Sequence, residues 1–137
     1  MRIFSIDNYN SGYYSSFVMK NNKVSLKEYQ RLVKTTAKKF TDKDKEISLL
    51  GLGVAGEAGD LVGCIKKTTY HSDNQTAGIK ENIGDTMWYL AMICNFFGWE
   101  FEQVLAENIN KLKARYPKGF THKNASRDGK RIDWNEK

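Results

Sequence analysis

The stretch LLGLGVAGEAGDLVGCIKK, residues 49–67, decides the fold of this 137-residue chain. Apolar residues recur through it at helical spacing, starting with Ile47 just before it and continuing as Leu50, Val54, Leu61 and Ile65. Five glycines interrupt this helix, and each costs up to ~1 kcal/mol of helix propensity relative to alanine. They are Gly51, Gly53, Gly56, Gly59 and Gly63. We therefore predict a helix over about 43–67 whose glycines allow another helix or a ligand to approach closely.

One helix should precede this stretch. Ser25 is followed three residues later by Glu28, which is the pattern of a capping box. An apolar stripe of helical period continues from there, so the first helix is predicted to end near Thr41.

Two helices should follow it. The polar segment 68–77 is expected to be a loop, and the third helix is predicted over about 78–97, with Gly98 ending it. The fourth helix is predicted over about 101–116, before Pro117. The third helix is apolar on nearly all sides, which predicts that it is buried all round.

Together these segments predict an all-α four-helix bundle, because no segment is typical of a core strand. The domain boundaries follow from the same pattern. We expect an N-terminal extension over 1–24, a helical domain over 25–120 and a polar C-terminal tail over 121–137, with Trp134 as an anchor.

Acidic residues stand where apolar ones are expected. Glu57 falls within the apolar stripe of the second helix, and Asp60 lies three residues on. Asp85 lies in the third helix, with Glu81 and Asn82 one turn before it. A carboxylate on an apolar face is costly unless it is paired or bound to a cation. Two such helices packed together would gather oxygen ligands for Mg²⁺, or for Mn²⁺ in its place.

Two alternatives remain open for these acids. They can form buried pairs with lysines, for which Lys66, Lys67 and Lys80 are the candidates, or they can be surface residues of helices whose phase differs from the predicted one. A zinc site is not favoured, because no histidine or cysteine joins the set.

Composition narrows the class of protein. The formal net charge is +6 and the sequence pI is about 9.3, which suits nucleic acid, an acidic membrane or a phosphorylated small molecule. The basic residues are spread out, so a nucleic-acid partner is not expected. Cys64 and Cys94 lie in apolar helical stretches, which predicts buried free thiols and not a disulfide. We expect the protein to be located in the reducing cytoplasm. No apolar run approaches the ~18 residues of a membrane span.

Three segments resemble the MazG-like nucleoside triphosphate pyrophosphohydrolases, of the all-α NTP pyrophosphatase superfamily. They are residues 49–67 as quoted above, IKENIGDTMWYLA at 79–91 and NINKLKARYPKGF at 108–120. The resemblance covers about residues 25–120. It implies metal-assisted hydrolysis of a nucleoside triphosphate between its α- and β-phosphates, in a homodimer or homotetramer.

The family pattern is Glu-x-x-Glu on one helix and Glu-x-x-Asp on the next, and these acids bind Mg²⁺. Glu57, Asp60 and Asp85 match three of the four positions, with Asp60 one methylene shorter than the usual glutamate. The fourth position holds Asn82, which offers a neutral oxygen, so the adjacent Glu81 is the other candidate for this ligand. Glu57 or Glu81 is then the candidate to orient the attacking water or to take its proton.

The resemblance also implies a phosphate-binding face on the fourth helix. Lys111 and Arg115 match the basic residues of the family, and Asn108 lies on the same helical face. Trp88 or Tyr89 is either a stacking partner for the base or part of the core. Because Asn82 replaces a glutamate, a nucleotide-binding module with weak or no turnover remains the alternative function.

Overall fold

The computed structural model describes residues 23–126. Its elements, in chain order, are α2 (Leu26–Val33), the 3-10 helix η1 (Lys34–Thr36), α3 (Lys43–Tyr70), α4 (Thr76–Phe97), α5 (Phe101–Arg115) and α6 (His122–Ala125). The described residues form helices and, outside them, one isolated bridge between Pro117 and Gly119, so the all-α prediction is confirmed. Most of the predicted N-terminal extension and the tail from residue 127, with Trp134, lie outside the described residues.

The first helix begins as predicted but ends early. The Ser25 hydroxyl accepts a hydrogen bond from the Glu28 backbone N–H at 3.2 Å. The helix changes to 3-10 geometry after Val33, and the prediction of an end near Thr41 is wrong. The hydroxyls of Thr35 and Thr36 donate to the carbonyls three residues earlier, at 2.7 and 2.9 Å. Such bonds compete with the helical ladder.

The turn between α3 and α4 is shorter than predicted. α3 continues to Tyr70 and α4 begins at Thr76, so the predicted loop over 68–77 shrinks to 71–75. The Thr68 hydroxyl accepts a hydrogen bond from the Gln75 backbone N–H at 2.9 Å, and this bond draws the two helix ends together.

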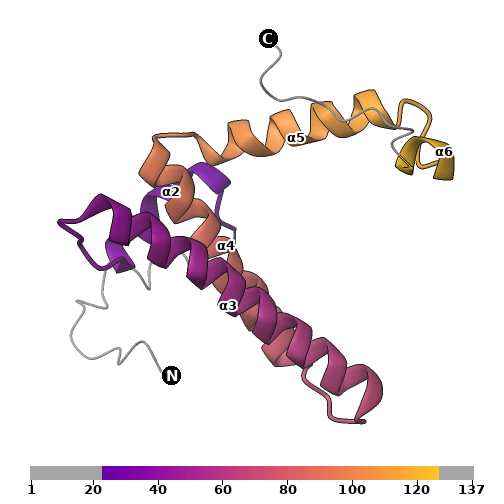
Figure 1. Cartoon of the computed structure of the whole chain (residues 1–137), viewed down its shortest axis with the longest axis horizontal. Coiled ribbons are helices and arrows are strands. Elements are labelled where there is room, and N and C mark those ends of the chain that lie inside the picture. The colour runs from indigo at the N-terminus through magenta and orange to yellow at the C-terminus, as the bar shows by residue number, and fades with distance from the viewer. Residues whose placement is uncertain (1–22, 127–137) are drawn as a thin grey trace.

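α3 and α4, the two longest helices among residues 23–126, form an antiparallel helical hairpin (Figure 1). Two glycines allow the close approach. A Cβ on Gly53 would overlap the ring of Tyr89, and a Cβ on Gly78 would lie 3.0 Å from the Cys64 Sγ. The other glycines of α3 have open space beside them in this chain. Close helix contact therefore accounts for Gly53, as the sequence predicted, and leaves the rest without an intrachain partner.

The core lies at the end of the hairpin nearest α2. Its buried apolar residues are Val33, Leu50, Ala91, Met92, Cys94 and Phe101. The buried Gln30 side chain ties the elements together there. Its Nε2 donates to the Trp99 carbonyl at 2.7 Å and to Asn95 Oδ1 at 3.1 Å, and its Oε1 accepts from the Phe101 N–H at 2.8 Å. These bonds hold the α4–α5 corner against α2.

The prediction that the third helix is buried all round is wrong for this chain. α4 packs on α3 and α2, while α5 contacts α2 and then leads away from the hairpin (Figure 1). Ile83 on α4 is consequently 50% exposed. The outer face of α3 is equally open, with Leu52 72% and Val62 63% exposed. Both helices are apolar on several faces, but other parts of this chain do not cover all of those faces.

We expect Gly53→Ala to destabilise the fold by about 1–3 kcal/mol, because the added methyl would overlap the Tyr89 ring. Gly51→Ala is the matched control, since it lies two residues away on α3 with open space beside it. It should be neutral or stabilise by up to ~1 kcal/mol through helix propensity. Urea unfolding followed by circular dichroism measures both. Equal effects would show that Gly53 does not set the helix separation.

Candidate functional site: an acidic cluster on the α3–α4 hairpin

The hairpin brings the predicted acids of both helices to one stretch of its length. Gly53 meets Tyr89 on one side of this stretch, and Cys64 meets Gly78 on the other. Between these contacts, α3 supplies Glu57 and Asp60, and α4 supplies Glu81 and Asp85. Each pair lies on one helical face, since its members are three or four residues apart. We call these four carboxylates the acidic cluster.

The charges of the acidic cluster act on one another. The pKa of Glu57 is raised above its ordinary value, first by burial and then by the negative charges of Asp85, Asp60 and Glu81. All four predicted carboxylates therefore lie within electrostatic reach, although they come from two helices. Like charges this close are unfavourable unless a cation joins them.

Two tyrosines border the acidic cluster. The pKa of Tyr89 is raised by burial and then by the charges of Glu57 and Asp85. The pKa of Tyr29, on α2, is raised by burial and by Asp85. The Tyr29 hydroxyl donates to the Gly84 carbonyl at 3.4 Å, next to Asp85 in the sequence. Both tyrosines therefore lie within electrostatic reach of the acidic cluster.

The acids are less buried than predicted. Glu57 is partly exposed, and Asp60, Glu81 and Asp85 are exposed. The expectation that they lie inside the bundle is wrong for this chain, because α5 does not cover the hairpin there. The alternative of lysine pairing finds no support either. Within residues 23–126 no ion pair joins these acids to the candidate lysines Lys66, Lys67 and Lys80.

The donor set fits a hard divalent cation, because it offers carboxylate oxygens and one amide, with no sulfur or imidazole. As the side chains stand, no three acidic, histidine or cysteine residues in the described part of the chain converge closely enough to hold an ion. Their side chains would have to rotate toward one another to share one. The uncompensated repulsion on Glu57 favours that movement when a cation is present.

Asn82 and Glu81 occupy different places. The Asn82 Nδ2 donates toward the Cys64 Sγ at 3.5 Å, so this side chain faces α3. Glu81 is exposed, yet its charge contributes to the raised pKa of Glu57. The amide is thus engaged with a thiol, while the neighbouring carboxylate belongs to the acidic cluster.

The predicted substrate-binding residues are not brought to the acidic cluster. α5, which carries Asn108, Lys111 and Arg115, leads away from the hairpin (Figure 1). Asn108 is exposed, and Lys111 and Arg115 are partly buried. Trp88 packs against the core, and its Nε1 donates to the Thr36 hydroxyl at 2.8 Å. That bond ties Trp88 to η1, which favours the core alternative for this residue.

Gln30 and Tyr29 lie near the site although the sequence does not single them out. Nothing in the local pattern marks Gln30, because its partners lie 65 to 71 residues away. Tyr29 lies in the apolar stripe of the first helix, which by itself predicts packing and no functional role. Its relation to Asp85 depends on how α2 lies across α4.

A family model described as the MazG nucleotide pyrophosphohydrolase domain matches residues 45–120, more than half of the chain. The chain belongs to this family. The match spans α3, α4 and α5, and it contains the whole acidic cluster. Membership indicates nucleotide pyrophosphohydrolase activity in general, and such domains are typically soluble and dependent on a divalent metal.

The chain is also similar to a phage protein. Gene 37 protein of Mycobacterium phage L5 is 29% identical over 83 residues, which are 57% of this chain and 73% of that protein. No solved structure matches the chain significantly.

We expect Glu57→Gln to stabilise the metal-free protein near neutral pH. Because the pKa of Glu57 is raised on folding, the folded chain binds this proton more tightly than the unfolded chain does. The group's contribution to stability therefore falls as pH rises from about 4.5 through the raised pKa. The variant should unfold at a higher temperature than wild type near pH 7 in EDTA, with little difference near pH 4.

The matched control is Glu107→Gln, an exposed glutamate in the middle of α5 outside the acidic cluster, which should leave the melting temperature unchanged at both pH values. Added Mg²⁺ should then raise the melting temperature of wild type more than that of Glu57→Gln, since a ligand that binds the folded state stabilises it. A Glu57→Gln variant that is less stable than wild type at pH 7 would contradict the repulsion.

Proposed function

We propose that this protein is a Mg²⁺-dependent nucleotide pyrophosphohydrolase that converts a (d)NTP to the (d)NMP and pyrophosphate. The observation that carries the proposal is the acidic cluster, in which Glu57 is partly buried beside the charges of Asp85, Asp60 and Glu81 within the family's matched domain. A stable fold retains such a cluster at a cost, which a divalent cation and its phosphate ligands would offset.

The carboxylates have two tasks in this proposal. Asp60, Asp85 and one of Glu81 or Asn82 would hold the metal, with Glu57 completing the set. Bound Mg²⁺, or Mn²⁺ in its place, supplies charge neutralisation of the phosphates and a lowered pKa of bound water. Glu57 is one candidate to orient the attacking water or to accept its proton. Glu81 is the second candidate for that role.

We propose Glu81 as the fourth metal ligand, with Asn82 as the alternative. Glu81 already acts on Glu57 electrostatically, whereas the Asn82 amide is turned toward Cys64. The same observation supports the second candidate function, a metal-dependent nucleotide-binding module with weak turnover. An amide engaged with a thiol contributes less to a cation than the glutamate of the family pattern.

Pyrophosphate release from a panel of NTPs and dNTPs with Mg²⁺ tests the enzyme. We expect Glu57→Ala and Asp85→Ala to lower kcat/KM by at least ~100-fold, which corresponds to about 2.7 kcal/mol of transition-state stabilisation. Glu102→Ala is the matched control on exposed surface. Wild-type release no faster than that of the two cluster variants would refute the enzyme and leave nucleotide binding to be measured by calorimetry.

A second pair of variants decides the fourth ligand. If Glu81 is the fourth metal ligand, Glu81→Gln should lower turnover about as much as Asp85→Asn does. Asn82→Glu should then change turnover little. If Asn82 limits the site, Asn82→Glu should raise turnover by at least ~10-fold because it adds a charged oxygen ligand. The same assay, with Mg²⁺ titrated for each variant, gives the metal affinity.

We further propose that the protein is a cytoplasmic homodimer or homotetramer. The outer face of α3 exposes Leu49, Leu52, Val62, Ile65 and Tyr70. By length and hydropathy, α3 is the one helix in the described part of the chain that could cross a membrane, a test that helices of soluble proteins also pass. Glu57 and Asp60 near its middle would be costly in lipid. A second copy would cover this face and could bring the α5 residues Asn108, Lys111 and Arg115 toward the acidic cluster.

Light scattering coupled to size exclusion tests the assembly. We expect wild type to be a dimer or tetramer, and Leu52→Lys to shift it to monomer with its helix content retained, since a lysine cannot be buried cheaply in an apolar contact. Val24→Lys, at an exposed apolar residue before α2, is the matched control and should leave the mass unchanged. A monomeric wild type would refute the assembly and leave the enzyme assay unaffected.

A further inference from the structure

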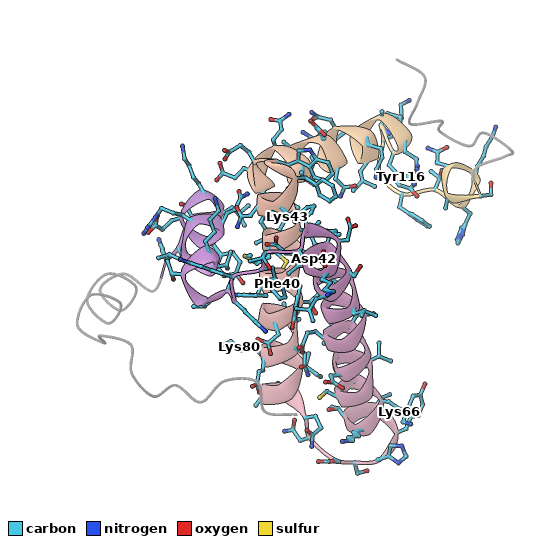
Figure 2. The ribbon with its side chains drawn as sticks, turned by 60° about the vertical axis from the view of Figure 1, so that its left-hand side comes forward. Phe40, Asp42, Lys43, Lys66, Lys80 and Tyr116 are labelled. Carbon is cyan, nitrogen blue, oxygen red and sulfur yellow. The ribbon has the colours of Figure 1, made fainter. Side chains whose placement is uncertain are left out.

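A second charged feature lies at the other end of α3 from the α3–α4 turn. The segment after η1, the first turns of α3 and Met92 of α4 enclose an open hollow of about 300 Å³. Its charged lining is four lysines and one carboxylate: Lys34, Lys38, Lys39, Lys43 and Glu46. Phe40 adds an aromatic wall (Figure 2). We call this feature the lysine hollow.

The charge of the lysine hollow is only partly offset. Lys43 pairs with Glu46 at 2.7 Å, and Lys38 lies 5.5 Å from the centre of the Phe40 ring. Lys34 and Lys39 have no carboxylate within ion-pair distance among residues 23–126. Four ammonium groups against one carboxylate leave an excess of three positive charges around a small volume. Such an excess attracts a compact polyanion.

The lysine hollow is separate from the acidic cluster. Lys43 precedes Glu57 by 14 positions on one continuous helix, which corresponds to ~20 Å along its axis at about 1.5 Å per residue. Figure 2 shows Lys43, Asp42 and Phe40 at one end of α3 and Lys66 at the other. A ligand in the hollow therefore does not need the metal that the acidic cluster would hold.

We propose that the lysine hollow binds a di- or oligophosphate group, supplied either as free pyrophosphate or as the phosphate tail of a nucleotide. Lysines recognise phosphate as point charges on flexible stems and need no fixed fork geometry, so several of them can close on one small polyanion. Pyrophosphate matches the hollow in charge, and its size suits a volume at the lower end of the range for ligand sites.

A nucleic acid fits the lysine hollow less well. A polynucleotide backbone needs a continuous basic track, whereas the other lysine pairs of the chain lie elsewhere. Lys66–Lys67 are near the α3–α4 turn, and Lys111 and Lys113 are on α5, which leads away from the hairpin. The positive charge of the hollow is thus local.

Calorimetric titration of the full-length protein with pyrophosphate in EDTA tests the proposal. Without metal the acidic cluster repels pyrophosphate, so any binding comes from basic residues, and the variants show whether these are the lysines of the hollow. We expect Lys38→Gln/Lys39→Gln to weaken binding by at least ~10-fold, or ~1.4 kcal/mol. Lys66→Gln/Lys67→Gln removes the same charge at the far end of α3 and should weaken it by less than ~2-fold. Circular dichroism confirms that both variants fold.

Further arms separate the ligand's source and the site. An α,β-methylene nucleotide binding at least ~10-fold more tightly than pyrophosphate would assign the hollow to a nucleotide tail, and equal or weaker binding to free pyrophosphate. Glu57→Gln should retain pyrophosphate binding, so this result does not depend on the proposed catalysis. No pyrophosphate binding, equal losses in the two double variants, or binding of a single-stranded oligonucleotide without pyrophosphate binding would overturn the proposal.

Discussion

The contact of the Tyr89 ring with the bare backbone at Gly53 is the constraint on which the rest of the structure depends. It allows α3 and α4 to approach closely, and together with the contacts of Cys64 it sets which residues of the two helices face each other. That register brings Glu57 and Asp60 of one helix to Glu81 and Asp85 of the other. A shift of one turn would separate these acids by ~5 Å along the axis.

The same packing creates an electrostatic cost. Glu57 is partly buried beside three like charges. Burial and the neighbouring carboxylates also raise the pKa of Tyr89 and Tyr29. The fold tolerates this because its stability comes from elsewhere, from the apolar cluster at the α2 end and the Gln30 bonds that join three elements. A natural fold that breaks a rule of burial in one place usually does so at a functional site.

The open faces of α3 and α4 have one physical origin. Both helices carry apolar residues on more sides than the rest of this chain covers. α5 leads away from the hairpin and does not close over it. An apolar helix surface of this extent on a soluble domain is typical of a protein interface. The charged residues are separated by sign along the hairpin. The acids gather near its middle, and an excess of lysines gathers at the start of α3.

The sequence by itself determined the helices, the Ser25 cap, the residues of the acidic cluster and the family, because spacing and capping depend on residues close together in the chain. It predicted the close approach at a glycine without saying which of the five was involved. The tertiary structure alone decided that Gly53 is that glycine, that the charge of Glu81 acts on Glu57 and that the Asn82 amide meets Cys64. It also shows that α4 and the acids are more exposed than their sequence pattern predicts. Which side of a helix is covered depends on contacts between residues far apart in sequence, and periodicity carries no information about them.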